Sequence, residues 1–265
     1  MNDSFDTGRS LPPPPPPPPP PAAQPPEPAA QPPEPPGKSP GALPRAAWGP
    51  ARTLGALGAL LVALFVEVAV LAFLFDPEFD SLGSRLVLQA TLAATLVGVA
   101  FAAAAVGGAG VSAADLGLRR PQRNFIVPTL VTYFGYIGCA LVVAALLAPE
   151  QEDVTRELGV DEGTFGAIAA GALVVAVAPF TEEVFFRGFM FSGMRRALPF
   201  AAAALIPSAI WGLFHFTGSE SWGVVIQLTI FGLWLSWLYE RTGSLWPPIA
   251  VHAFNNAIAF AILTS

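Results

Sequence analysis

The feature that most constrains the fold of this chain is a series of seven apolar stretches with very few charged residues. They lie near residues 53–75, 86–106, 125–147, 164–198, 200–217, 222–239 and 245–263. A helix needs about 20 apolar residues to cross the hydrocarbon core of a bilayer, and most of these stretches are long enough. Only 12% of the 265 residues are charged, about half the share of a soluble domain. The sequence therefore predicts an all-α polytopic transmembrane bundle of seven or eight helices.

The stretch at 164–198 is the one that leaves the helix count open. As a single helix it would be about 52 Å long, which exceeds the thickness of the hydrocarbon core. Pro179 lacks a backbone donor and clashes with the preceding turn, so it predicts a break. We expect one helix at 164–178 and a second from Thr181 to about Leu198, with Thr181 as the N-cap. Whether 164–178 crosses the bilayer decides between seven and eight helices, and decides the side of the C-terminus.

The charges between the stretches alternate in sign, which predicts the orientation in the membrane. Arginines follow the second and fourth stretches, and acidic residues follow the first and third. Because cytoplasmic loops carry the excess of Lys and Arg, the N-terminus is expected to be cytoplasmic. Short loops around a compact core are typical of a prokaryotic inner or cell membrane protein. The net charge of −6 gives no indication of nucleic-acid binding, and the single Cys139 excludes an internal disulfide.

Residues 1–50 differ from the rest of the chain. They hold 20 of the 29 prolines, including an unbroken run at 12–21, and too little apolar surface to fold. We predict a disordered tail rich in polyproline II that acts as a spacer; the alternative is that a partner's aromatic groove binds it. Two further regions follow, the N-terminal membrane helices at 51–148 and a C-terminal helical core at 164–263.

The core contains an unusual polar segment. Glu182, Glu183 and Arg187 lie within an apolar run, where ionised groups are costly and usually face a bundle interior. Glu183 and Arg187 are four residues apart, which favours a structural ion pair, whereas Glu182 points about 100° away and has no partner in its own helix. Glu67 is a lone carboxylate in the first stretch, and we leave it outside the site.

Both histidines of the chain lie in apolar stretches, each with a companion four residues away. Trp211 precedes His215 and Asn256 follows His252, so each pair shares a helix face. If 181–198 and 200–217 form an antiparallel hairpin, Glu182 and His215 lie at the same depth. We therefore expect Glu182, His215, His252 and Asn256 to converge on one buried cavity, with Trp211 serving mainly in packing.

Three motifs in this order carry a family resemblance: the two glutamates with Arg187, the aromatic residue before His215, and His252 before Asn256. Over about 164–260 the chain resembles the CAAX prenyl protease and bacteriocin-processing family, also called the Abi or type II CAAX endopeptidase-like family. Segments 116–121 and 239–246 support the likeness. The family usually has phenylalanine where this chain has Trp211.

The resemblance implies an intramembrane endopeptidase whose site opens to the cytoplasm. In that reading Glu182 and His215 activate a water, and His252 and Asn256 hold the carbonyl oxygen as it gains charge. Family members are often described as metalloproteases, and Glu182, His215 and His252 could hold Zn²⁺ as an unusual split set. The compact His-Glu-x-x-His motif is absent, and we favour the metal-free account while leaving both open.

Two other function classes stay open. A non-catalytic scaffold or immunity-type protein could keep the fold and bind a peptide, and a transporter could use Glu67, Glu182 and the histidines as a proton relay. We prefer the peptidase because a scaffold does not need four buried polar groups and no transporter-like repeats are visible. Membrane lipid and a peptide or protein substrate are the expected partners. Nothing in the sequence selects a prenylated substrate over a transmembrane, leader or bacteriocin peptide.

Overall fold

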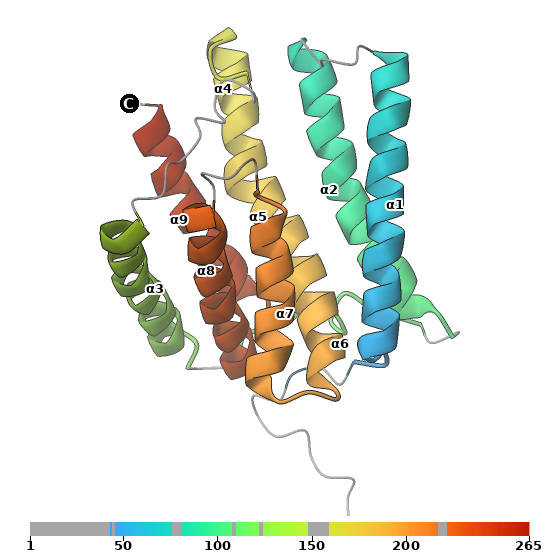
Figure 1. The fold of residues 1–265 in the computed structure, drawn as a ribbon, viewed down its shortest axis with the longest axis vertical. Coiled ribbons are helices and arrows are strands. Elements are labelled where there is room, and N and C mark those ends of the chain that lie inside the picture. The colour runs from blue at the N-terminus through green and yellow to red at the C-terminus, as the bar shows by residue number, and fades with distance from the viewer. Residues whose placement is uncertain are drawn as a thin grey trace, which may run out of the picture. The chain divides into compact units, whose positions relative to one another are not determined.

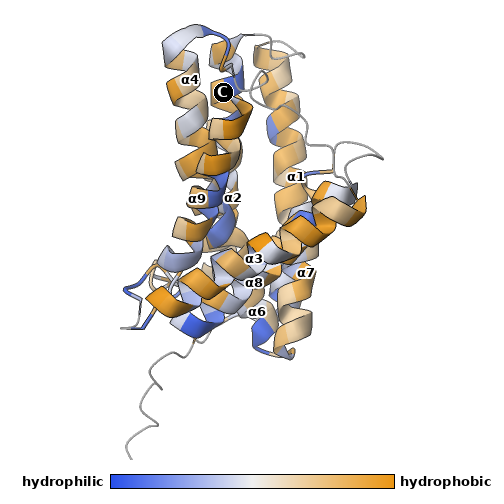
Figure 2. Ribbon diagram, turned by 90° about the vertical axis from the view of Figure 1, so that its left-hand side faces the viewer, coloured by the Kyte–Doolittle hydropathy of each residue, from blue (hydrophilic) through white to orange (hydrophobic). Residues whose placement is uncertain are grey.

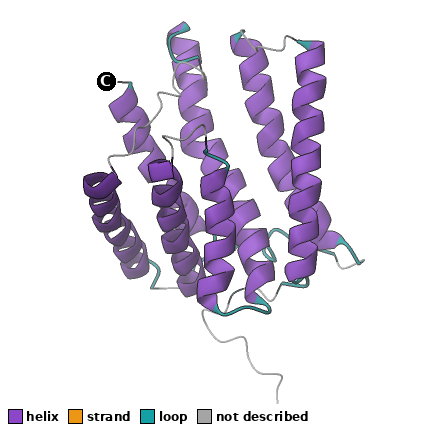
Figure 3. Ribbon diagram, viewed as in Figure 1, coloured by secondary structure: helices purple, strands orange, loops and turns teal. Residues whose placement is uncertain are grey.

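The computed structural model describes residues 43, 46–75, 81–107, 110–121, 124–147, 159–216 and 222–264. All of the elements below belong to one unit of the chain, Lys38–Ser265. Within the described residues the regular structure is helical and no strand is present (Figure 3). Most of the predicted proline-rich tail lies outside the described residues.

The helices follow the predicted apolar stretches closely (Figure 1). The elements are α1 (Pro50–Leu74), α2 (Leu82–Ala105), α3 (Ile126–Leu147), α4 (Gly163–Ala172), η1 (Leu173–Val177), α5 (Ala178–Glu182), η2 (Glu183–Phe191), α6 (Ser192–Arg195), α7 (Phe200–Leu213), α8 (Trp222–Thr242) and α9 (Trp246–Leu263). Six helices of the described residues are long and apolar enough to cross a membrane, and α7 is a shorter apolar helix. Figure 2 shows α1 almost wholly in hydrophobic colours. The fold class predicted from the sequence is confirmed.

The expected break at Pro179 is wrong. Elements α4 to α6 form one continuous helix from Gly163 to Arg195, so the described part of the chain contains seven helices and the eight-helix alternative fails. Two wider π-helical segments, η1 and η2, lie inside it. The turn before Pro179 is widened, which makes room for the proline ring where an ordinary α-turn would clash. Thr181 is not an N-cap, because its hydroxyl donates back to the carbonyl of Val177 at 3.0 Å.

Helices α1 and α2 lie side by side, and a polar contact joins them within the apolar region (Figure 1). The hydroxyl of Thr95 donates to Oε2 of Glu67 at 2.6 Å, whereas Oε1 of Glu67 has no hydrogen-bond partner among the described residues. The intramembrane glutamate that the sequence left unassigned is therefore paired with the neighbouring helix. Its bond fixes the rotation of α2 against α1.

The two segments that supported the family resemblance contact each other. The amide of Leu245 donates to the carbonyl of Gly117 at 2.8 Å, and Nε of Arg119 donates to the carbonyl of Gly243 at 2.6 Å. Gly117 has a φ of 92°, a conformation that glycine adopts without steric cost. These bonds hold the chain before α3 against the turn between α8 and α9, at one end of the bundle.

The last residues of the predicted tail pack against the helical core. Trp48 is buried, its Nε1 donates to the carbonyl of Phe189 at 2.9 Å, and its ring stacks on that of Phe189 with centroids 5.3 Å apart. Ala46 is buried as well. The folded core therefore begins a few residues before α1, within the range that the sequence assigned to the tail.

Candidate active site

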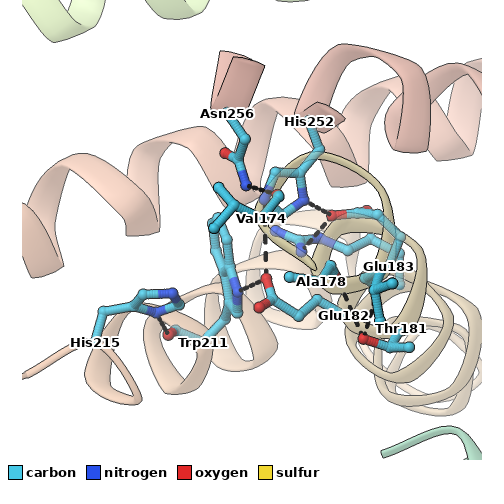
Figure 4. Close-up of polar contacts among 11 residues, drawn as sticks. Val174, Ala178, Thr181, Glu182, Glu183, Trp211, His215, His252 and Asn256 are labelled. Carbon is cyan, nitrogen blue, oxygen red and sulfur yellow. Dashed lines mark hydrogen bonds and ion pairs between the residues drawn. The ribbon is translucent and has the colours of Figure 1, made fainter. Parts of the chain in front are cut away.

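Glu183 is the centre of a buried cluster contributed by η2 and α9 (Figure 4). Its Oε1 accepts from Nη1 of Arg187 at 2.8 Å and from Nδ1 of His252 at 3.0 Å. The side chains of Glu183, Arg187 and His252 are 0%, 1% and 3% exposed. The ion pair expected from the four-residue spacing is present, and the glutamate also fixes a histidine 69 residues away in the sequence.

The guanidinium of Arg187 also lies over an aromatic ring. Its central carbon is 4.7 Å from the centroid of the Trp211 ring, within the range of a cation–π contact. Oε2 of Glu183 and Nη2 of Arg187 have no hydrogen-bond partner among the described residues. The stacked indole therefore supplies part of the stabilisation that this buried cation needs.

Glu182 occupies a different environment from its neighbour. Its Oε2 accepts from Nε1 of Trp211 at 2.7 Å and lies 3.8 Å from Nε2 of His252 (Figure 4). Its side chain is 17% exposed. The indole N–H of Trp211 is thus a polar group of the site. The sequence analysis expected Trp211 to serve mainly in packing and did not predict this hydrogen bond. No local sequence pattern predicts this hydrogen bond, because Glu182 and Trp211 are 29 positions apart and lie on different helices.

Two aromatic side chains contact the His252 ring. The rings of Trp211 and Phe231 meet it edge-on, with centroids 5.2 and 5.6 Å away. A carboxylate oxygen can only accept a hydrogen bond, so Nδ1 of His252 carries the hydrogen that Glu183 receives. This partner assigns the tautomer: in the neutral ring Nε2 is an acceptor, and it donates only when both nitrogens are protonated.

His215 lies just beyond the C-terminal end of helix α7. Helix α7 ends at Leu213, and His215 follows in a turn where its side chain is exposed. The predicted helix to 217 is therefore too long. Nδ1 of His215 contacts the carbonyl oxygen of Trp211 at 2.9 Å, and because a carbonyl only accepts, Nδ1 must donate. Nε2 is left as the nitrogen available to a ligand.

Asn256 contacts the backbone of the continuous helix Gly163–Arg195, which we call the central helix. Its Nδ2 donates to the carbonyl of Val174 at 3.0 Å. In η1 the amide of Ala178 bonds the carbonyl of Leu173, five residues back, so the next bond in that register would join residue 179 to Val174. Residue 179 is proline and has no N–H, so the asparagine replaces the missing donor. One further N–H of the Asn256 amide remains.

Glu182 and His215 line a common cavity of about 460 Å³. The residues of the central helix that line it include Val174, Ala178 and Thr181, and Trp211 forms part of its wall. The structure thus brings Glu182, Trp211 and His252 into one group, with Glu183 behind it. His252 and Asn256, which the sequence placed on the same cavity, are not among the residues that line it. Figure 4 shows His215 bonded to the backbone of Trp211 on α7, and Asn256 to that of Val174 on η1.

The structure does not gather Glu182, His215 and His252 into a cluster of metal-ligand type. Among the described residues, no group of three or more His, Cys, Asp or Glu side chains is placed to hold a metal ion. Oε2 of Glu182 already accepts from the indole of Trp211, and His215 bonds its own helix. The metal dependence of any activity stays a prediction.

Comparisons with known proteins agree with this picture. Residues 164–258 match the family model described as Type II CAAX prenyl endopeptidase Rce1-like, which spans the central helix and all of the site residues. Taken with the six long apolar helices, the match supports an integral membrane protein in which residues 164–258 are similar to type II CAAX prenyl endopeptidases. The family resemblance read from the three motifs is confirmed over this segment.

Two curated relatives, both from Bacillus subtilis (strain 168), match parts of the chain. The "Putative membrane peptidase YdiL" is 32% identical over 80 residues, 30% of this chain and 31% of the relative. The "Uncharacterized protein YyaK" is 26% identical over 164 residues, 56% of this chain and 54% of the relative. The chain thus spans about a third and about half of their lengths. No solved structure matches it.

Proposed function

We propose that this protein is an intramembrane endopeptidase that hydrolyses a peptide bond of a membrane-associated substrate. The observation that carries the proposal is the contrast within the adjacent pair: Oε1 of Glu183 accepts from two buried donors, whereas Glu182 faces a cavity and accepts from a single donor. The match to a CAAX endopeptidase model and the relative named as a membrane peptidase support the same reaction class.

In this proposal Glu182 is the general base. A water in the cavity gives a proton to its carboxylate, and the water oxygen attacks the substrate carbonyl carbon, so that the carbonyl oxygen becomes an oxyanion. The proton then passes to the leaving amine as the carbon–nitrogen bond breaks. Nε2 of His215 would help to hold the attacking water, since Nδ1 is engaged by the Trp211 carbonyl.

The oxyanion would be held by His252 and Asn256. His252 can donate from Nε2 only in its doubly protonated form, since Nδ1 already donates to Glu183. Asn256 keeps one N–H after serving Val174. Donors fixed before the reaction in a water-poor site are worth a few kcal/mol each in the transition state. Glu183 and Arg187 act as positioning residues in this scheme.

The experiment compares new N-termini in membranes. Membranes from cells that produce the wild-type protein or Glu182→Gln are incubated, and newly formed amino termini are labelled and identified. We expect a set of membrane-protein cleavages that occurs only with the wild type. Identical termini in both samples would contradict the proposal and leave the scaffold alternative. Repeating the wild-type incubation after exhaustive chelation tests metal dependence, and we expect the cleavages to persist.

A further inference from the structure

The cavity shared by Glu182 and His215 has a second wall outside the segment that matches the family model. This wall is formed by one residue of α1 and four of α2: Leu64, Gln89, Leu92, Ala93 and Leu96. The four residues of α2 are spaced as one helix face, at positions i, i+3, i+4 and i+7. We call these five residues the α1–α2 wall.

The rotation of α2 that presents this face is fixed from the other side of the helix. Thr91, Ala94 and Thr95 line a separate groove between α1 and α2, where Thr95 donates to Glu67 at 2.6 Å. Because a hydrogen bond in apolar surroundings is costly to break, it holds α2 in one register. The register keeps Gln89 on the cavity face.

Gln89 is the one side chain of the α1–α2 wall that can form hydrogen bonds. Its side chain is exposed, and its amide has no hydrogen-bond partner among the described residues. A carboxamide carries one acceptor and two N–H donors, the same groups that an extended peptide backbone presents. We propose that Gln89 binds the backbone of the substrate peptide across the cavity from Glu182, an inference that rests on the proposed function.

The same wall limits the kind of substrate. The other four residues are apolar, so a charged substrate side chain placed against them would lose its hydration without a partner. A peptide in a continuous helix pairs its interior backbone groups within itself, whereas an extended segment leaves its N–H and C=O groups free to bond the amide of Gln89. The substrate class is therefore an unwound, apolar segment of a membrane peptide.

The test combines crosslinking with kinetics. A photoreactive benzoylphenylalanine replaces residue 89 or, as a matched control, Val87, which is 37% exposed on another face of α2. Each protein is placed in phosphatidylcholine and phosphatidylglycerol vesicles with a biotinylated peptide of about 20 apolar residues. One peptide has a helix-breaking Gly-Pro centre, and the other is a continuous leucine helix. We expect position 89 to label the broken peptide at least fivefold more than the continuous one, and position 87 to show no preference.

Kinetics separate this inference from the proposed function. On a cleaved membrane peptide, Gln89→Leu should raise KM about three- to tenfold with kcat within twofold, as expected for one neutral hydrogen bond. Thr91→Val, which removes a hydroxyl bonded only to its own helix, should change neither. Equal labelling at 87 and 89, labelling of lipid alone, or an unchanged KM would overturn the role of Gln89. If position 89 labels the broken peptide preferentially but no peptide is cleaved, the binding role of the α1–α2 wall is supported and the proposed peptidase activity is rejected.

Discussion

The two neighbouring carboxylates, Glu182 and Glu183, occupy opposite kinds of environment. Glu183 is fully buried and accepts from Arg187 and His252, so its charge is matched within the protein. Glu182 is partly exposed, has one indole donor and borders the cavity. Two consecutive residues of one helix can therefore have different roles. Glu183 fixes the positions of Arg187 and His252, and Glu182 faces the cavity, where it is accessible for reaction.

The largest expected effect on folding is at the buried member of the pair. Glu183→Gln leaves the guanidinium of Arg187 buried without its anion, which should lower the free energy of unfolding by about 3–5 kcal/mol. Equilibrium unfolding in mixed detergent micelles measures this loss. The double variant Glu183→Leu/Arg187→Met removes both charges and should recover at least half of it. A double variant as unstable as the single one would show that the ion pair is not the cause.

The next effect concerns the support of the central helix. Asn256→Ala leaves the carbonyl of Val174 without a donor and should cost about 1–3 kcal/mol of unfolding free energy. Pro179→Ala restores a backbone N–H at the position that faces this carbonyl in the π-helical register. Asn256→Ala should therefore cost less in the Pro179→Ala background. Equal costs in the two backgrounds would mean that Asn256 does not compensate for the proline.

A smaller effect on stability is expected at Trp211, which contacts both Glu182 and Arg187, the ion-pair partner of Glu183. Trp211→Phe keeps a ring beneath Arg187 but removes the N–H bonded to Glu182. Water in the cavity can replace that donor, so the unfolding free energy should fall by only about 1 kcal/mol. Turnover should fall about tenfold because the base loses its orientation. Trp234→Phe on α8 is the matched control, and an equal loss of turnover there would remove the special role of Trp211.

The smallest change in stability is expected at the free member of the pair. Glu182→Gln keeps an oxygen that can accept from Trp211 and removes a charge that lies 3.8 Å from Nε2 of His252, beyond hydrogen-bond distance. Its unfolding free energy should stay within about 1 kcal/mol of the wild type, in the range of most substitutions outside special sites. A loss as large as that of Glu183→Gln would end the proposed division between the two residues.

The sequence was sufficient for features that depend on local spacing. Apolar length predicts the helices, and the four-residue spacing predicts the pair of Glu183 and Arg187. The break at Pro179 was wrong because the missing donor is replaced by Asn256, which lies 82 residues from Val174 in the chain. The indole bond to Glu182 and the contact of His252 with Glu183 were not predictable for the same reason. Such contacts arise from packing between helices, which no local pattern specifies.

The most direct test of the unequal roles of the two glutamates is the turnover of one cleaved membrane peptide. The wild type and Glu182→Gln are compared at equal concentrations of folded protein. A general base contributes about 10²–10⁴-fold, so we expect turnover to fall at least 100-fold while the unfolding transition stays in place. Retention of wild-type turnover by the folded Glu182→Gln protein would contradict the assignment of Glu182 as the base.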